Sequence, residues 1–132
     1  MANIKTVNPW SWQEPLGFSH AALVTQGQRV LYCAGQTSVD AAGAPLHAGN
    51  MQAQFDQAMR NLETVLRDAG MSLANLVRLN YYVTDMKGFL TISGHVAARM
   101  AAAGIAPPGT LLGVSALFSP EILIEIEATA VA

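Results

Sequence analysis

The fold is decided by residues 122–131, ILIEIEATAV. Alternate positions of this stretch form two sets, the first apolar and the second largely polar: Ile122, Ile124, Ile126 and Ala128 against Leu123, Glu125, Glu127 and Thr129. Because successive side chains of a β-strand point to opposite faces of its sheet, the pattern predicts a strand with one apolar and one carboxylate-bearing face. The apolar face packs on helices, and the other face meets solvent or a second subunit.

Upstream of this strand, the sequence pattern predicts two more strands with a helix between them. Residues 77–84 alternate with the same period of two and predict a strand with two different faces. Asp85 opens a helical pattern that continues through Met100 and stops in residues 104–109, where two prolines are adjacent. Residues 110–117 predict the strand that leads to the last one.

The longest helix is predicted between Asn50 and Gly70. Apolar residues recur there at spacings of three and four, which is the pattern of an amphipathic helix: Met51, Phe55, Met59, Leu62 and Leu66. Asn50 is a residue type that caps helix N-termini, and Gly70 one that ends helices.

Towards the N-terminus, residues 19–26 and 29–36 predict two strands joined near Gly27 as a hairpin. The order of elements is then ββαβαββ, without an internal repeat or a linker. We therefore expect residues 1–132 to form one α+β domain whose two helices cover one face of the sheet.

The composition favours an oligomer. Hydrophobic residues make up 52% of the chain and charged residues 12%, against roughly 25% charged residues in soluble domains. Two helices cover only one side of a sheet, so we expect a second subunit to cover the other side.

Other features argue against several protein classes. No apolar run reaches ~18 residues, so no membrane span is expected. Residues 1–12 lack the apolar core of a signal peptide, so a cytoplasmic location is expected. A net charge of -2 without a basic cluster argues against nucleic-acid binding. Cys33 is the single cysteine and is expected to be a small buried hydrophobe, because it has no second cysteine for a disulfide or a Cys-x-x-Cys metal site.

Several short strings, taken in order and at their spacing, resemble the RidA/YjgF superfamily, whose members are also called endoribonuclease L-PSP. The resemblance runs nearly end to end. The strings are Gly17-Phe18-Ser19-His20-Ala21, Ala34-Gly35-Gln36, Asn61-Leu62 with Leu66 and Ala69-Gly70, Tyr82-Val83-Thr84-Asp85, and Ile124-Glu125-Ile126-Glu127-Ala128.

This resemblance implies a chorismate-mutase-like fold with a mixed six-stranded sheet and two helices on one face. It also implies a homotrimer packed sheet to sheet, a small-molecule cleft at each subunit boundary, and neither a cofactor nor a metal. In the best-known branch, the cleft hydrolyses reactive enamines and imines to a keto acid and ammonia. An arginine in the loop before the penultimate strand holds the substrate carboxylate there.

That arginine is absent from this chain. Its position falls on Thr110 or, in a shifted alignment, on Gly109, and no lysine or arginine follows Arg99. Two further substrate-binding positions of the family differ, because an aromatic hydroxyl residue is replaced by Phe18 and an asparagine by Ser93. The pattern resembles a divergent branch whose cleft does not depend on bidentate guanidinium binding.

Glu125 retains the family's acidic position and is the candidate catalytic residue. A carboxylate in a partly buried cleft has a raised pKa and can act as a general base towards water. The alternative is structural, in which Glu125 and Glu127 satisfy hydrogen-bond donors at a subunit interface.

Histidines are the other groups that titrate near neutral pH. His20 lies in the segment that forms the family's cleft, so we weigh substrate binding or proton transfer against a structural role. His47 and His95 are expected to be surface or packing residues.

Backbone and amide groups complete the candidate site. Gly35 lets the chain approach a ligand closely, and Gln36 is placed to hydrogen-bond it. Gly109 and Thr110 are expected to offer N–H groups and a hydroxyl in place of the arginine, which suits a neutral or weakly anionic ligand. Arg78 is the one basic side chain on a strand face that could reach a ligand, but a cross-strand or interface pair with a glutamate is expected instead.

Two functions follow from these residues. The first is hydrolysis of a small imine, enamine or related metabolite, with Glu125 activating water. The second is a non-catalytic trimer that binds a small metabolite and regulates a partner, which the missing arginine favours.

Overall fold

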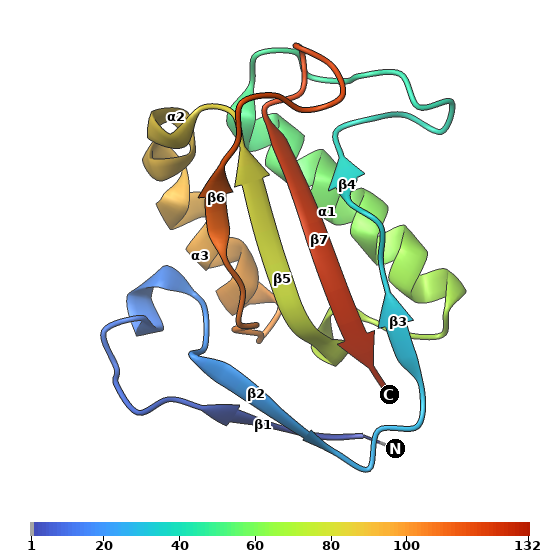
Figure 1. Ribbon diagram of the computed structural model, residues 1–132, viewed down its shortest axis with the longest axis vertical. Coiled ribbons are helices and arrows are strands. Elements are labelled where there is room, and N and C mark those ends of the chain that lie inside the picture. The colour runs from blue at the N-terminus through green and yellow to red at the C-terminus, as the bar shows by residue number, and fades with distance from the viewer. Residues whose placement is uncertain (1) are drawn as a thin grey trace.

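A computed structural model describes residues 2–132 (Figure 1). Its strands are β1 (Asn3–Val7), β2 (Ala21–Thr25), β3 (Val30–Tyr32), β4 (Gln36–Thr37), β5 (Leu76–Val83), β6 (Leu111–Gly113) and β7 (Ile124–Val131). Its α-helices are α1 (Met51–Asp68), α2 (Met86–Thr91) and α3 (Ser93–Ala102), and short 3-10 helices occur at η1 (Glu14–Leu16) and η2 (Leu73–Asn75). The α+β class is confirmed.

Strand β7 lies in the middle of the main sheet. It pairs antiparallel with β5 on one side and with β3 and β4 on the other, and β6 adds a parallel edge to β5. β1 and β2 form a separate two-stranded antiparallel sheet. Figure 1 shows the three α-helices together behind the main sheet, so no helix of residues 2–132 covers its other face, called the open face below.

The N-terminal part differs from the sequence-based prediction. The predicted hairpin of residues 19–26 with 29–36 is wrong, because β2 pairs with β1 and β3 pairs with β7. The chain changes direction at Gln26, whose φ is +60°, and the N–H groups of Gln28 and Arg29 then donate to the carbonyl of Ala132. Seven strands in two sheets therefore replace the six expected in one.

The helix predicted from Asp85 through Met100 is divided into α2 and α3 at Ile92. The Thr91 hydroxyl donates to the Gly88 carbonyl, and the Ser93 hydroxyl donates to the Leu90 carbonyl. Glycine, β-branched and hydroxyl residues are weak helix formers, and these side-chain bonds compete for backbone carbonyls at the break.

Helix α1 matches its prediction and supplies a large part of the core. Every residue of the predicted apolar stripe is at most 7% exposed: Met51, Phe55, Met59, Leu62 and Leu66. Asn50 caps the helix by accepting from the Ala53 N–H at 3.0 Å. Gly70 ends it with a φ of +71°, which an L side chain adopts only with strain, while the Met71 N–H bonds back to the Leu66 carbonyl.

The predicted strands 110–117 and 122–131 are shorter than expected, and Gln54 explains the start of the second. This α1 side chain is fully buried. Its Nε2 donates to the carbonyls of His47 and Glu121, and its Oε1 accepts from the Leu123 N–H at 2.8 Å. The Glu121 carbonyl and the Leu123 N–H, directly before β7, are thereby bonded to α1 instead of to a neighbouring strand.

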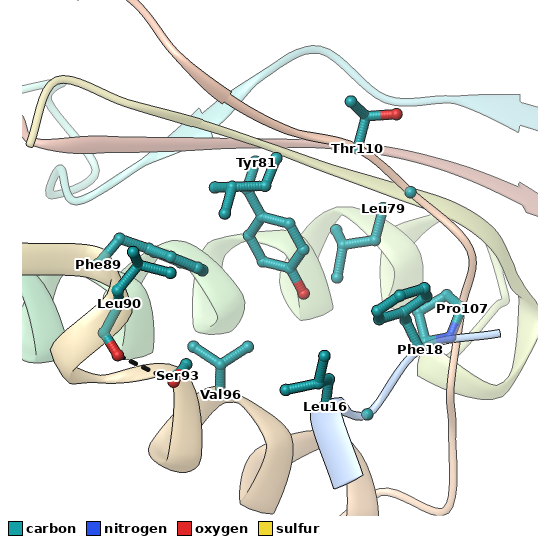
Figure 2. Close-up of a pocket in the computed structure, with 13 residues that line it drawn as sticks. Leu16, Phe18, Leu79, Tyr81, Phe89, Leu90, Ser93, Val96, Pro107 and Thr110 are labelled. Atoms are coloured by element: carbon teal, nitrogen blue, oxygen red, sulfur yellow. Dashed lines mark hydrogen bonds between the residues drawn. The ribbon is translucent and has the colours of Figure 1, made fainter. Parts of the chain in front are cut away.

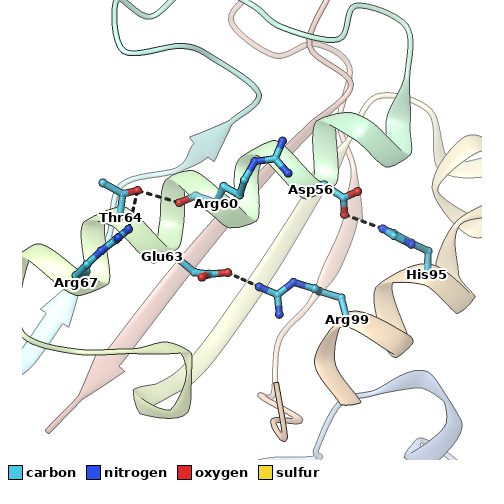
Figure 3. A network of polar contacts seen from close by, with 7 residues as sticks. All are labelled: Asp56, Arg60, Glu63, Thr64, Arg67, His95 and Arg99. Atoms are coloured by element: carbon cyan, nitrogen blue, oxygen red, sulfur yellow. Dashed lines mark hydrogen bonds and ion pairs between the residues drawn. The ribbon is translucent and has the colours of Figure 1, made fainter. Parts of the chain in front are cut away.

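Two ion pairs join the exposed sides of α1 and α3 (Figure 3). His95 Nε2 lies 2.7 Å from Asp56 Oδ1, and Arg99 pairs with Glu63. Half-exposed pairs of this kind each stabilise a fold by up to about 1 kcal/mol. His95 is therefore a packing residue between helices, as expected. Among residues 2–132, no helix has both the length and the hydropathy needed to cross a bilayer.

Candidate functional site

The polar face of β7 meets the polar face of β5 on the open side of the main sheet. In the antiparallel register, Tyr82 lies opposite Glu125 and Asn80 lies opposite Glu127. Because the period of a strand is two, all four side chains are on the face without helices. The carboxylate-bearing face predicted from the sequence is thus formed.

Glu127 is held in its ionised form. Its Oε1 accepts from the Tyr82 hydroxyl at 2.7 Å and from the Asn80 amide at 3.2 Å. These two hydrogen bonds, with a smaller contribution from the charge of Arg78, lower the pKa of Glu127. The expected pair of Arg78 with a glutamate is not formed within this chain: among residues 2–132 no ion pair within 4 Å joins it to one, and only its charge acts on Glu127.

Glu125 has the opposite electrostatic environment. Burial raises its pKa first, and the neighbouring charge of Glu127 raises it further. The pKa values of two carboxylates on one strand therefore shift in opposite directions. The shift favours the neutral form of Glu125 and the anion of Glu127. Such separation is typical of acid–base sites, although structural networks also produce it.

Gly35 makes room for the Glu125 carboxylate. A Cβ atom built on Gly35 would lie 1.8 Å from Glu125 Oε1, so only glycine permits this position of the side chain. The two residues share a shallow hollow of about 230 Å³ with Tyr82, Glu127 and the loop residue Leu117. Gly35 was predicted to let the backbone approach a ligand closely. In this structure, the group that it lets approach is the Glu125 carboxylate.

A second pocket lies on the opposite, helix-covered face (Figure 2). It measures about 260 Å³ and is lined by the N-terminal segment, β5, the α2–α3 region and the loop before β6. Four of the predicted substrate-binding residues line it: Phe18, Ser93, Gly109 and Thr110. Within one chain, the structure therefore divides the predicted site between the two faces of the sheet.

The expected hydrogen-bond donors in the loop before β6 are partly occupied. The Thr110 N–H donates to Asn80 Oδ1 at 3.0 Å, which corrects its expected role as a free donor to a ligand. Gly109 packs so closely on β5 that an added Cβ would lie 1.6 Å from the Leu79 carbonyl oxygen. The glycine is therefore required by the packing of the loop on the strand.

His20 and Gln36 line neither pocket. The Gln36 amide donates to the carbonyl of Ala34, two residues earlier, at 3.2 Å. The His20 ring packs edge-on against Trp10 and Trp12 at centroid distances of 5.1 and 4.9 Å, and its Nε2 is buried without a protein partner among residues 2–132. This geometry is that of an aromatic cluster in the N-terminal segment.

The remaining reactive side chain is buried. Cys33 is 9% exposed, and burial raises the pKa of its thiol, in keeping with a packing role. Within residues 2–132, no three His, Cys, Asp or Glu side chains come together to hold a metal ion.

The sequence reasoning missed the tyrosines of β5. Tyr81 projects into the helix-side pocket, and Tyr82 bonds to Glu127 on the open face. Two adjacent tyrosines in a strand must point to opposite faces, so this dipeptide was a signal that each face of the sheet carries a hydroxyl.

The fold and the site define a class of small α+β proteins that carry a carboxylate pair on the open face of the sheet. The endoribonuclease L-PSP family matches residues 14–132, so the chain belongs to that family, within the RidA/YjgF superfamily.

Known proteins support this membership. The solved structure of the Rid family protein YyfB of Yersinia pestis superposes with a TM-score of 0.88 and is 37% identical, covering 98% of this chain and 99% of that one. A RutC family protein of Pyrococcus horikoshii is 30% identical over 76% of this chain and 77% of its own length. The 2-iminobutanoate/2-iminopropanoate deaminase of Homo sapiens is 29% identical over 58% of this chain and 53% of its own length.

Proposed function

We propose that this protein hydrolyses a small imine, enamine or related metabolite, with Glu125 as the general base that activates water. The observation that carries the proposal is the carboxylate pair of β7, in which Glu125 has a raised pKa and Glu127 a lowered one. The human relative is named a 2-iminobutanoate/2-iminopropanoate deaminase, and that activity is imine hydrolysis of the kind proposed here.

The reaction needs one water and one base. Glu125 removes a proton from water as its oxygen bonds to the imine carbon, and the C=N bond becomes a single bond. The proton then passes from Glu125 to nitrogen, which gives a carbinolamine. Glu125 next moves the proton of the new hydroxyl to nitrogen, the C–N bond breaks as the C=O bond forms, and a carbonyl compound and ammonia are released. A base whose pKa lies near the working pH serves these proton transfers.

The substrate differs from a simple imino acid in this proposal. No lysine or arginine follows Arg99, so the loop before β6 has no cation for a carboxylate. The Glu127 anion on the open face also repels an anionic ligand. A neutral substrate, or one whose carboxylate is bound by a neighbouring copy, suits this site.

We further propose that the site is completed in a homotrimer, where the open face of one copy meets the next copy. What supports this is the apolar surface on and beside that face, where Tyr32 is 81%, Phe118 64% and Leu112 47% exposed. Clustered exposed apolar side chains mark interaction surfaces. Ligands would then bind at the boundary between copies.

A second function, metabolite binding without catalysis, is favoured by the missing arginine. In that case the Glu125 carboxyl would only contribute a hydrogen bond to the ligand. A Glu125→Gln variant separates the two functions, because it should reduce turnover by about a hundredfold or more in an enzyme but only adjust affinity in a binder.

The test is ammonia release from 2-iminopropionate and 2-iminobutyrate, generated in place by an amino-acid oxidase, with and without the protein. A neutral imine should be assayed beside them. Acceleration that is lost in Glu125→Gln supports hydrolysis. An absence of acceleration with every imine would instead support the binding function.

A further inference from the structure

We propose that a hollow in the segment between β1 and β2 binds a small methylated ammonium ion, which the indole rings of Trp10 and Trp12 and the carboxylate of Glu14 hold. The inference goes beyond the proposed hydrolysis and does not rest on it. The hollow shares no lining residue with the Glu125 hollow or with the pocket on the helix-covered face.

The hollow is shallow and is formed by a single stretch of the chain. It measures about 570 Å³ and is lined by Asn8, Pro9, Trp10, Ser11, Trp12 and Glu14. Both tryptophan side chains are 61% exposed, although tryptophan is highly buried on average in folded proteins. Two large aromatic rings that are left in water around one hollow mark a place where the protein binds something.

The charge of the hollow selects a cation. Glu14 is the one charged residue that lines it, and among residues 2–132 no ion pair within 4 Å joins this carboxylate to a basic side chain. Indole rings also attract cations, because the face of an aromatic ring carries negative partial charge, and tryptophan does so most strongly. An anion would be repelled by the carboxylate and would gain nothing from the rings.

The openness of the site to water favours a methylated cation over a primary ammonium. A primary ammonium is a compact, strongly hydrated charge, so it loses much of its hydration when it leaves water. Methyl groups on the nitrogen spread the same charge over an apolar surface that can contact the indole rings. Quaternary ammonium ions are accordingly the ligands that clusters of aromatic rings recognise.

The hollow is formed before any ligand arrives. Asn8 Oδ1 accepts from the His20 N–H at 2.9 Å and closes the segment, and both indole rings pack edge-on against the His20 ring. Inside the segment, the Glu14 N–H donates to the Ser11 carbonyl at 3.1 Å, and the side chain of Gln13 is buried. Binding therefore costs little ordering of the chain.

The test is a titration with choline, followed by intrinsic tryptophan fluorescence and by calorimetry at constant ionic strength. Trp10 and Trp12 are the only tryptophans of the chain, so the fluorescence observes this hollow alone. The dissociation constant should be on the order of 1 mM. Neohexyl alcohol, in which an uncharged carbon replaces the nitrogen of choline, should bind at least about tenfold more weakly, and ethanolamine at least about threefold more weakly.

Three variants assign the binding to the named side chains. Glu14→Gln should lower the affinity for choline about threefold, whereas Glu121→Gln, the same change at an exposed glutamate before β7, should leave it unchanged. Trp10→Leu keeps an apolar side chain but removes the ring, so the affinity should fall about threefold to tenfold while Trp12 still reports binding. Thermal unfolding verifies that each variant folds.

Glu125→Gln should bind choline as the natural protein does, so that failure here is distinct from failure of the proposed hydrolysis. The proposal is overturned if choline produces no saturable change in fluorescence or heat, or if neohexyl alcohol or ethanolamine binds as tightly as choline. Equal affinities of Glu14→Gln and Glu121→Gln would overturn it as well. So would a changed oligomeric state of Trp10→Leu in size-exclusion chromatography, since the exposed rings would then be covered by a second copy.

Discussion

The Oε1 atom of Glu125 lies 1.8 Å from the point where a Cβ atom on Gly35 would be. The Glu125 side chain, from the middle of β7, therefore fits against the loop after β3 only because residue 35 is a glycine. A Gly35→Ala variant must therefore move the carboxylate. Because the end of a flexible side chain can move easily, we expect the free energy of unfolding to change by less than about 1 kcal/mol. Ammonia release should nevertheless fall at least about tenfold, since a displaced general base is inefficient.

Gly94→Ala is the matched control for this variant. An added Cβ at Gly94 meets nothing within 4 Å, and alanine is the better helix former. It should keep full activity. Equal activity of Gly35→Ala and the natural protein would show that the position of the Glu125 carboxylate is unimportant.

The two glutamates of β7 predict opposite dependences of stability on pH. Glu125 has a folded pKa above its unfolded value, so its protonated form favours the fold at low pH, and this contribution is lost as the pH rises through the folded pKa. Glu125→Gln should consequently gain stability over the natural protein as the pH rises from acid through the folded pKa of Glu125.

Glu127→Gln should show the reverse trend. The lowered pKa of Glu127 stabilises the fold above the unfolded pKa, and this contribution is lost as the pH falls. Urea unfolding at several pH values measures both trends. Parallel pH profiles for the two variants would contradict the assignment of opposite environments.

Gln54 is predicted to be essential to stability. Replacing it with leucine leaves the Leu123 N–H and the carbonyls of His47 and Glu121 without their partner. Each unsatisfied buried group costs roughly 1–3 kcal/mol, so we expect a loss of about 3 kcal/mol in urea unfolding. Gln52→Leu, at an exposed position of the same helix, should change stability by less than about 0.5 kcal/mol.

Gly109→Ala is expected to destabilise the fold by about 2 kcal/mol or more, because the new methyl group meets a backbone carbonyl that cannot rotate away. Gly113→Ala in β6 is the control, since its Cβ would make an ordinary contact of 3.6 Å with Met86. A thermal unfolding comparison of the two variants is sufficient. Similar melting temperatures would mean that the loop before β6 adjusts more freely than its contact with Leu79 indicates.

The parts of the fold that sequence periodicity predicted are those with one buried face. The stripe of α1 and the alternation of β7 report burial directly, and both are confirmed. The partner of β2 could not be predicted in this way, because an alternating strand does not specify its neighbour. The register of Gly35 beside Glu125 depends on contacts between residues 90 positions apart, which local patterns do not contain.

The candidate site shows the same limit. Glu125 was found from a resemblance and its strand face from alternation, but the roles of Tyr82 and Asn80 depend on the β5–β7 register. Phe18, Ser93, Gly109 and Thr110 were expected beside Glu125, and within one chain they line the other face of the sheet. In the proposed homotrimer, packing between copies would decide which of these faces meet, and such information is not local to any segment.

The central place of β7 has a consequence for synthesis on the ribosome. Strands β3, β4 and β5 all pair with β7, which is translated after them. Until β7 has left the exit tunnel, the main sheet lacks its central strand, and β5 has only β6 to pair with. We therefore expect the main sheet to close only after β7 emerges, so that the apolar faces of α1 and β5 stay partly exposed during synthesis.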